Sequence, residues 1–294
     1  LGAMGYDATT LGNHEFDYRA RGLAEMLNAA VDSGDPVPPI VQANYKPPEE
    51  DADTWAAWDR YGIGDYLILE RGGVRYGIFG LMGEEADSNA PMSGMEFEPI
   101  ADAAERTVAA LEEAGADFII CLSHSGTDGR GKGEDYELAK RVDGIDVILS
   151  GHTHTTLTEP LVVNDTYLVS AGPYCENLGS LTLRKDSSGT KTLVDYHLTP
   201  IDETLPEAPD INALVEAWKA QVGETYLDRY GFTYDQVLTT AEFDLSTPAP
   251  GIQQGNNLGN LAADAFLWAA ERLEASAPNV QTVSVTAAGV LRAP

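Results

Sequence analysis

The chain has 294 residues, a formal net charge of −29 and a hydrophobic content of 43%, which is ordinary for a globular protein. This length is sufficient for a large core and for more than one domain. Such an acidic surface repels polyanions, which argues against a groove for a nucleic-acid polymer, and no apolar stretch is long enough to span a membrane.

Strand-like and helix-like segments alternate over the first 150 residues, and this order predicts a layered α/β domain. The early segments are an amphipathic helix over 22–31, a buried strand over 40–43 and an irregular acidic insertion over 47–64. The later segments are a hairpin over 66–70 and 74–82, helices over 101–114 and 134–142, and strands over 118–122 and 147–149.

After Gly151 the pattern changes to short strands, mostly antiparallel, over 161–163, 167–170, 178–183 and 192–198. Prolines at 206 and 209 mark a boundary, and a long helix is expected over 210–230 with Asp210 as its N-cap. A further unit begins near Asp235, with strands over 237–243 and 280–286 and a helix over 258–273. We therefore expect an α/β domain over 1–205, a linker helix over 206–234 and a partial domain over 235–294.

Three short motifs contain four of the five histidines, and each motif follows a segment with the pattern of a buried strand. The motifs are Gly12-Asn13-His14-Glu15 with Asp17, Ser123-His124, and Gly151-His152-Thr153-His154. The carboxyl ends of strands are where α/β enzymes place their chemistry.

The histidines of the second and third motifs are candidate metal ligands. His152 and His154 are two residues apart and follow an apolar strand that ends at Gly151, so both can converge on one cluster. His124 also follows an apolar strand, and Gly126 lets the chain turn away from it. The alternative for any one of them is a structural histidine at the start of a loop.

The first motif combines a metal ligand with a proton-transfer group. The amide oxygen of Asn13 is a neutral hard ligand for a divalent cation, and Asp17 can orient the imidazole of His14. The alternative is that Asn13 and Asp17 only cap the following helix. Taken together, the three motifs indicate a two-metal phosphoesterase centre, against the alternative of unrelated polar residues at loop starts.

In four stretches, 5–17, 122–126, 146–155 and 257–265, the chain resembles the 5'-nucleotidase and UDP-sugar hydrolase family of calcineurin-like dinuclear metallophosphatases. The resemblance implies a layered α/β–β/α sandwich over 1–205, followed by the linker helix and part of an α+β 5'-nucleotidase-type C-terminal domain. It also implies export to an extracellular, periplasmic or cell-surface location.

The resemblance further implies two divalent metal ions, of Mn, Zn, Co or Fe. Asn13, His124 and His152 would hold one ion and His154 the other, while His14 and Asp17 would form the catalytic dyad beside the phosphate. A metal-bound hydroxide would then hydrolyse phosphate monoesters, with nucleotides as the leading small-molecule substrates. The alternatives are a 2',3'-cyclic phosphodiesterase or UDP-sugar hydrolase on the same centre, and a non-catalytic surface or binding protein.

The chain departs from this family at both ends. An Asp-x-His and a Gly-Asp are expected upstream of Leu1, so this stretch alone should bind the second metal weakly. Near the fourth matching stretch, residues 253–256 read Gln-Gln-Gly-Asn, where the nucleotide-cleaving members have an arginine. Arg292 is retained from a later motif and is the candidate substrate-binding residue.

Overall fold

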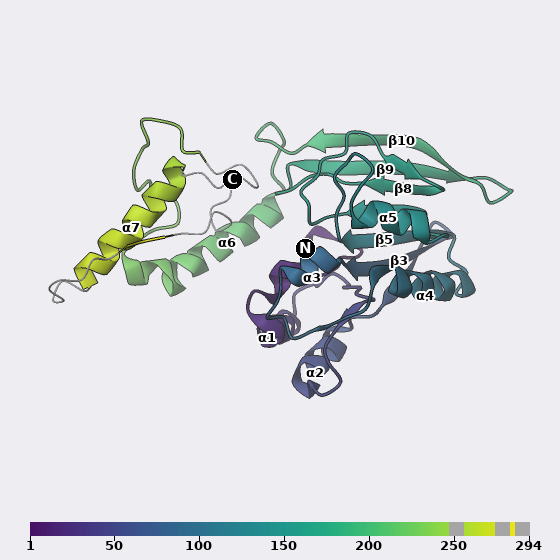
Figure 1. Cartoon of the computed structure of the whole chain (residues 1–294), viewed down its shortest axis with the longest axis horizontal. Helices are drawn as coiled ribbons and strands as arrows, with labels where there is room; N and C mark the ends of the chain where they lie inside the picture. Colours follow the sequence, from purple (N-terminus) through teal and green to yellow (C-terminus); the bar gives the residue numbers. More distant parts are fainter. Residues whose placement is uncertain (247–255, 274–282, 286–294) are drawn as a thin grey trace. The chain divides into compact units, whose positions relative to one another are not determined.

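A computed structural model describes residues 1–246, 256–273 and 283–285 of the chain (Figure 1). The chain divides into two compact units, Leu1–Ala213 and Leu214–Pro294. The first unit is a mixed α/β domain, as the sequence predicted. The division into 1–205, 206–234 and 235–294 remains a prediction.

The first unit is built on a six-stranded mixed sheet with the strand order β2-β3-β5-β6-β8-β7. Its strands are β2 (Tyr66–Arg71), β3 (Val74–Met82), β5 (Phe118–His124), β6 (Val147–Ser150), β7 (Leu161–Val163) and β8 (Thr166–Val169). The inner strands β3, β5, β6 and β8 are parallel, whereas β2 and β7 pair antiparallel at the edges. The parallel strands therefore bring their carboxyl ends to one edge of the sheet.

Helices α4 (Ile100–Glu113) and α5 (Glu134–Arg141) cover one face of this sheet (Figure 1). Leu111 of α4 and Leu138 of α5 join Ile119, Cys121 and Ile148 of the sheet in the main hydrophobic core. Burying aliphatic side chains of this size contributes about 1.5–3 kcal/mol each. The sheet is therefore held from this side by apolar packing.

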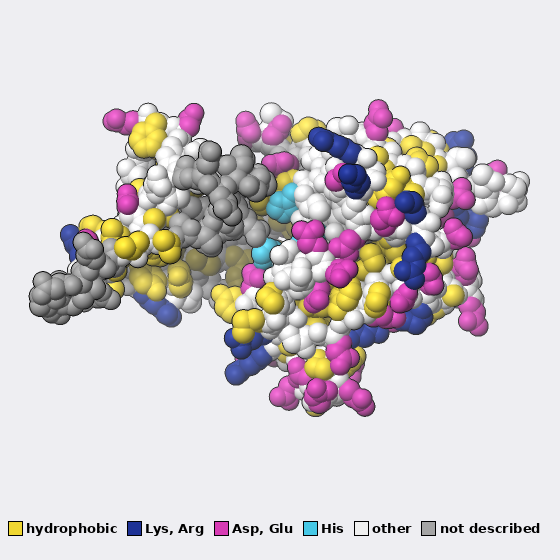
Figure 2. All heavy atoms as spheres, viewed as in Figure 1, with side chains coloured by type: hydrophobic (Ala, Val, Ile, Leu, Met, Phe, Trp, Pro, Cys, Tyr) yellow, Lys and Arg dark blue, Asp and Glu magenta, His cyan; other side chains and the backbone are white. Residues whose placement is uncertain are grey.

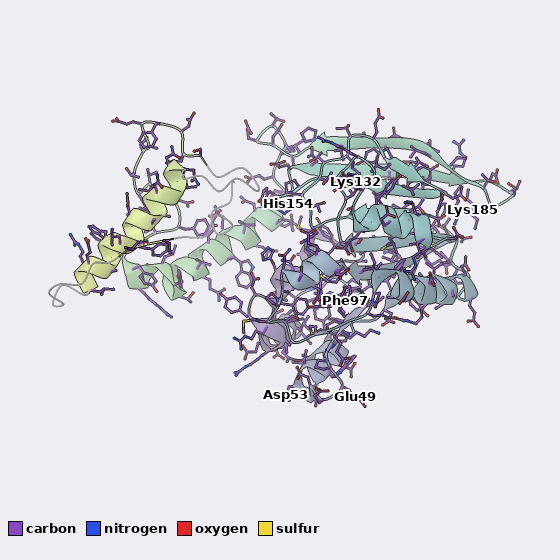
Figure 3. All side chains as sticks on the ribbon, in the orientation of Figure 1. Glu49, Asp53, Phe97, Lys132, His154 and Lys185 are labelled. Atoms are coloured by element: carbon purple, nitrogen blue, oxygen red, sulfur yellow. The ribbon has the colours of Figure 1, made fainter. Side chains whose placement is uncertain are left out.

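A long antiparallel hairpin, β9 (Asn177–Lys185) and β10 (Lys191–Pro200), lies on the other face of the sheet. Side chains alternate along a strand, so Phe118 points away from the face that carries Ile119, and the Lys191 ammonium lies 5.2 Å from the Phe118 ring centroid. Lys191 also pairs with Asp146 at 2.6 Å. Lys185, near the tip of the hairpin (Figure 3), pairs with Asp117 at 2.7 Å.

A second hydrophobic core lies under the N-terminal segment. It is enclosed by the 3₁₀ helix η2 (Asn13–Phe16), helices α1 (Arg19–Ser33), α2 (Ala52–Tyr61) and α3 (Glu84–Ser88), and strands β1 (Tyr45–Lys46) and β4 (Glu96–Phe97). The short 3₁₀ helix η1 (Gly2–Met4) precedes these elements and buries no residue. The rings of Phe16 and Tyr45 meet edge to face at 5.1 Å, and Leu23, Leu27 and Trp58 complete the cluster. Phe16 thereby anchors the turn that carries Asn13 and His14.

Two expectations for the first unit are wrong. Residues 40–43 are buried but form only isolated bridges, because their backbone groups bond in turn to Thr9, Gly64 and Gly80 and build no ladder with one partner. The insertion over 47–64 contains a helix, α2, whose N-cap Asp51 accepts the Thr54 N–H at 3.1 Å. The remaining elements match their predicted spans closely, although β8 also pairs parallel with β6.

The part of the chain after residue 208 differs more from its prediction. The long helix is α6 (Pro209–Thr225) followed by the 3₁₀ helix η3 (Leu227–Tyr230), so Asp210 lies inside the helix and is not its N-cap. Helix α7 (Asn257–Leu273) confirms the helix expected over 258–273. No strand forms over 237–243, and the strand expected over 280–286 falls largely outside the described residues. Among the described helices, none is long and apolar enough to cross a membrane.

Candidate metal centre

Two histidines lie at the carboxyl ends of adjacent parallel strands. His124 is the last residue of β5, and His152 follows β6 after Gly151. The strand register sets Ser123 opposite Ser150, and the Gly151 N–H donates to the Ser123 carbonyl at 2.8 Å. The two imidazole centroids are consequently 4.9 Å apart, with 57° between the ring planes.

Asn13 reaches the same point from the turn η2. Its side-chain Oδ1 lies 2.9 Å from Nε2 of His124, and the residue is buried. Gly12 makes this approach possible, because a Cβ at that position would lie only 2.7 Å from Cε1 of His124. Three of the predicted metal ligands, from three segments far apart in the sequence, are therefore brought together.

The electrostatic environment keeps these two histidines neutral at pH 7. Burial, together with the nearby His152, His14 and His154, lowers the pKa of His124 to about 4. Burial also lowers the pKa of His152, opposed by the carboxylates of Glu85 and Glu134. A neutral imidazole carries the lone pair that metal ligation requires.

His14 and Asp17 form an exposed pair beside this group. Nδ1 of His14 lies 3.1 Å and 3.2 Å from the two carboxylate oxygens of Asp17. Their side chains are 54% and 59% exposed, so solvent and a substrate can reach them. The predicted dyad therefore has the contact that its proposed role requires.

His154 occupies a different environment. It is exposed (Figure 3), and its ring meets that of Tyr174 edge to face at 5.2 Å. Both His152 and His154 have a positive φ, 72° and 55°, which is uncommon outside glycine and costs of order 1–3 kcal/mol. Thr153 stabilises this turn by donating to the Thr127 carbonyl at 2.9 Å. Figure 2 shows histidine side chains at the surface with acidic side chains nearby.

The donor set fits one divalent ion better than two. Asn13, His124 and His152 offer an amide oxygen and two neutral imidazoles, a mixed set that divalent ions such as Mn²⁺, Co²⁺ and Zn²⁺ accept. Within residues 1–246, 256–273 and 283–285, no three His, Cys, Asp or Glu side chains are grouped as metal ligands. His154 thus belongs to no such group of three among the described residues. Arg292, the predicted substrate-binding residue, lies outside the described residues.

Comparison with known proteins identifies the family. The sequence profile of the calcineurin-like phosphoesterases matches residues 3–156, which span β3, β5, β6 and all three histidine motifs. The chain belongs to this family. Membership implies divalent metal ions as cofactors, in agreement with the donor set at the strand ends.

The relatives of this calcineurin-like phosphoesterase include nucleotide-processing proteins. It is 32% identical to the trifunctional nucleotide phosphoesterase protein YfkN of Bacillus subtilis over 100% of this chain and 21% of that protein. It is 30% identical to a 5'-nucleotidase of Bos taurus over 91% of this chain and 46% of that protein. A snake venom 5'-nucleotidase of Gloydius brevicauda is 27% identical over 91% of this chain and 45% of its own length. The chain thus spans less than half of the length of each.

A solved structure agrees with this relationship. The crystal structure of a 5'-nucleotidase precursor from Thermus thermophilus superposes with a TM-score of 0.70 at 27% identity. The match covers 91% of this chain and 52% of that one. The chain is therefore related to 5'-nucleotidases in both sequence and fold.

The sequence analysis missed the residues that support the ligands. Asp135 in the first turn of α5 is fully buried and accepts hydrogen bonds from Ser123 and Ser150, the residues just before the two histidine loops. A signal for it existed, because Asp135 has the i, i+3, i+4 spacing with Leu138 and Ala139 that marks the apolar face of α5. A carboxylate at a core-facing position needs buried partners.

Proposed function

We propose that this chain carries the catalytic core of a metal-dependent phosphoesterase that hydrolyses phosphate monoesters, with nucleotides as the leading substrates. The observation that supports it most directly is the meeting of Asn13, His124 and His152 at one edge of the sheet. The exposed pair of His14 and Asp17, at 3.1 Å, supplies a proton-transfer group for the same site.

In this proposal Asn13, His124 and His152 hold a divalent cation. When bound, that ion would polarise a phosphoryl oxygen and lower the pKa of a coordinated water. Two features of the site favour binding of this ion. The low pKa of His124 keeps its imidazole ring neutral, and the 2.9 Å contact between its Nε2 and Oδ1 of Asn13 already brings the two proposed ligand atoms close together.

His14 is the proposed proton-transfer residue. Asp17 accepts the Nδ1–H of His14, which fixes the tautomer and the orientation of the ring. In this proposal, Nε2 would carry the proton transfer to a phosphoryl oxygen or to the leaving-group oxygen. Its exposure suits a role that requires direct contact with substrate.

A second ion is proposed at His154, with weaker binding than the first. His154 is the one described residue that we assign to it, and a single imidazole makes a poor site for a divalent ion. We expect occupancy of the first site at lower metal concentration than the second.

The substrate class rests on the relatives. Their names include a trifunctional nucleotide phosphoesterase and 5'-nucleotidases, so a nucleoside monophosphate is the first candidate. A 2',3'-cyclic phosphodiester and a UDP-sugar are alternative substrates for the same site. A relative named for snake venom supports an extracellular, periplasmic or cell-surface location.

The test is phosphate release by the full-length natural protein. It should be incubated with nucleoside monophosphates, 2',3'-cyclic nucleotides, UDP-glucose and 4-nitrophenyl phosphate, each with Mn²⁺, Co²⁺ or Zn²⁺ and each with EDTA. We expect metal-dependent turnover of at least one nucleotide. Absence of metal-dependent turnover on every substrate would overturn the proposal.

Metal stoichiometry separates the enzyme from a non-catalytic binding protein. The observation that favours the binding protein is the absence, among the described residues, of any three grouped His, Cys, Asp or Glu side chains. Two ions per full-length protein would support the enzyme. No bound ion at millimolar Mn²⁺ would support the binding protein.

A further inference from the structure

The carboxyl ends of β5 and β6 are joined by one buried carboxylate. Asp135 is 0% exposed, and its two oxygens accept from Ser123 Oγ at 2.5 Å, Ser150 Oγ at 2.5 Å and Gly126 N–H at 3.0 Å. Ser123 and Gly126 flank His124, and Ser150 lies two residues before His152. The carboxylate of Asp135 therefore bonds both to the segment that carries His124 and to the segment that carries His152.

These contacts are strong and local. A carboxylate that accepts from hydroxyl and amide donors makes short, charge-assisted hydrogen bonds. The Asp135 N–H also donates to the Gly126 carbonyl at 3.1 Å, so the start of α5 holds the turn after His124 from two sides. Ser125 Oγ lies 2.9 Å from Ser123 Oγ and extends the network by one hydroxyl.

Burial of this carboxylate is energetically unfavourable. Burial raises the pKa of Asp135 to about 6, although the bonds from Ser123, Ser150 and Gly126 oppose that change. An apolar residue at this position of α5 would avoid the penalty. Retention of a charge here needs a reason other than stability.

We propose that Asp135 is a positioning residue for the metal site, because it fixes the separation of the strand ends that present His124 and His152. This inference rests on the proposed function. In the absence of Asp135, both loops gain freedom, and each metal ion bound must then order them. Partners that orient ligands in this way typically change metal affinity by 10–100-fold.

The same two strands supply a matched control at their other ends. Asp146, just before β6, is also buried, and it accepts the Ile119 N–H of β5 at 2.7 Å and the Lys191 ammonium at 2.6 Å. It joins β5 and β6 far from the histidine loops. A general loss of sheet stability would follow from either substitution, whereas a loss of ligand positioning should follow from Asp135 alone.

The variants differ in how many of the hydrogen bonds made by Asp135 they retain. Asp135→Asn keeps an oxygen for Ser150 and Gly126 and can turn its amide group toward Ser123 Oγ, so it retains part of the network. Asp135→Ala removes all of it. Ser150→Ala removes one donor and leaves the carboxylate. It replaces Asp135→Ala in the measurements if Asp135→Ala fails to fold. Asp146→Asn is the control.

The first measurement needs no metal. Amide hydrogen exchange of the EDTA-treated full-length protein reports Gly151 N–H, which bonds to Ser123, and Ile119 N–H, which bonds to Asp146. We expect Asp135→Asn to accelerate exchange of the Gly151 amide at least tenfold and to leave the exchange rate of the Ile119 amide within about twofold of the parent. Asp146→Asn should accelerate exchange of the Ile119 amide and leave that of the Gly151 amide within about twofold. Equal acceleration of both amides in both variants would overturn the proposal.

The second measurement is Mn²⁺ affinity by isothermal titration calorimetry. We expect Kd to rise about tenfold for Asp135→Asn, and more for Asp135→Ala, with Asp146→Asn within twofold of the parent. Parental affinity in both Asp135 variants would overturn the positioning role, even if Gly151 exchanges faster. If the parent itself binds no Mn²⁺, the proposed function fails, while the exchange data still decide whether Asp135 holds the strand ends.

Discussion

The histidine cluster has a partly buried half, called the buried half below, and an exposed half. In the buried half, His124 and His152 lie at the ends of sheet strands and their rings are in contact, and His124 also contacts Asn13. His14 and His154 are exposed, with His14 paired with Asp17 and the ring of His154 against that of Tyr174. This difference agrees with the proposed roles, in which the buried half binds metal and His14 transfers a proton. Metal ligands benefit from a fixed geometry, whereas a proton-transfer group needs access to substrate.

The largest expected effect is on the buried half. His152→Ala should remove a metal ligand and reduce phosphate release by roughly 10³-fold, because several kcal/mol of transition-state stabilisation depend on the ion. Metal content by atomic absorption should fall in parallel. His197→Ala is the control, since His197 is an exposed histidine bonded to Asp195 at 2.8 Å. Full activity in His152→Ala would contradict the ligand assignment.

The buried half should also leave a signature in the pH dependence of stability. Asp135 has its pKa raised to about 6, so the folded state binds a proton more tightly than the unfolded state. Its contribution is therefore most favourable below pH 4 and is lost as the pH rises through 6. The difference in unfolding free energy between the parent and Asp135→Asn should change by about 2 kcal/mol between pH 4 and 7.

Urea unfolding in EDTA at several pH values measures this change. Groups far from Asp135 titrate alike in both proteins, so their contributions cancel in the difference. A difference that stays constant from pH 4 to 7 would show that the Asp135 carboxyl has an ordinary pKa.

The exposed half should affect turnover without affecting metal binding. His14→Ala is expected to lower kcat about 10²-fold, the usual contribution of a general acid, and Mn²⁺ affinity should stay within twofold. Asp17→Asn should lower kcat less, because the imidazole remains. The exposed pair of His197 and Asp195 is the matched control, and His197→Ala should leave kcat unchanged. Loss of metal from His14→Ala would show that His14 contributes to metal binding and contradict this separation of roles.

The smallest effect on the metal site is expected from a substitution at Gly12, which lies beside Asn13 and against the His124 ring. Gly12→Ala would place a Cβ 2.7 Å from the His124 ring, so the ring must move away from Asn13. We expect Mn²⁺ affinity to weaken about tenfold, with a loss of about 1–3 kcal/mol in stability. Gly223→Ala is the control, because nothing lies within 4 Å of the added methyl group. Unchanged affinity in Gly12→Ala would show that the ring adapts freely.

The proposed ligands are easier to predict from the sequence than the residues that support them. His124 and His152 were identifiable because an apolar strand before a polar loop is a local pattern. The bonds of Asp135 to Ser123 and Ser150 are not local, because they depend on the pairing of β5 with β6 and on α5 packing over both. Local patterns alone do not specify such contacts.

The same distinction explains the fold. The hairpin β2–β3 forms as predicted because its two strands are adjacent in sequence and Gly72 and Gly73, at φ of 59° and 79°, make its turn. Residues 237–243 have a strand-like composition but no partner strand among the described residues, and Val237 is 79% exposed. Propensity for a strand has no effect without a neighbouring strand.

The tilted pair of imidazoles gives the protein an internal spectroscopic probe. Each ring of His124 and His152 lies within the magnetic shielding region of the other, at a centroid separation of 4.9 Å. Their carbon-bound proton resonances are therefore sensitive to any rotation of one ring against the other. Arrival of a diamagnetic ion such as Zn²⁺ can be followed residue by residue through these ring-current shifts, in solution and without a label on the substrate.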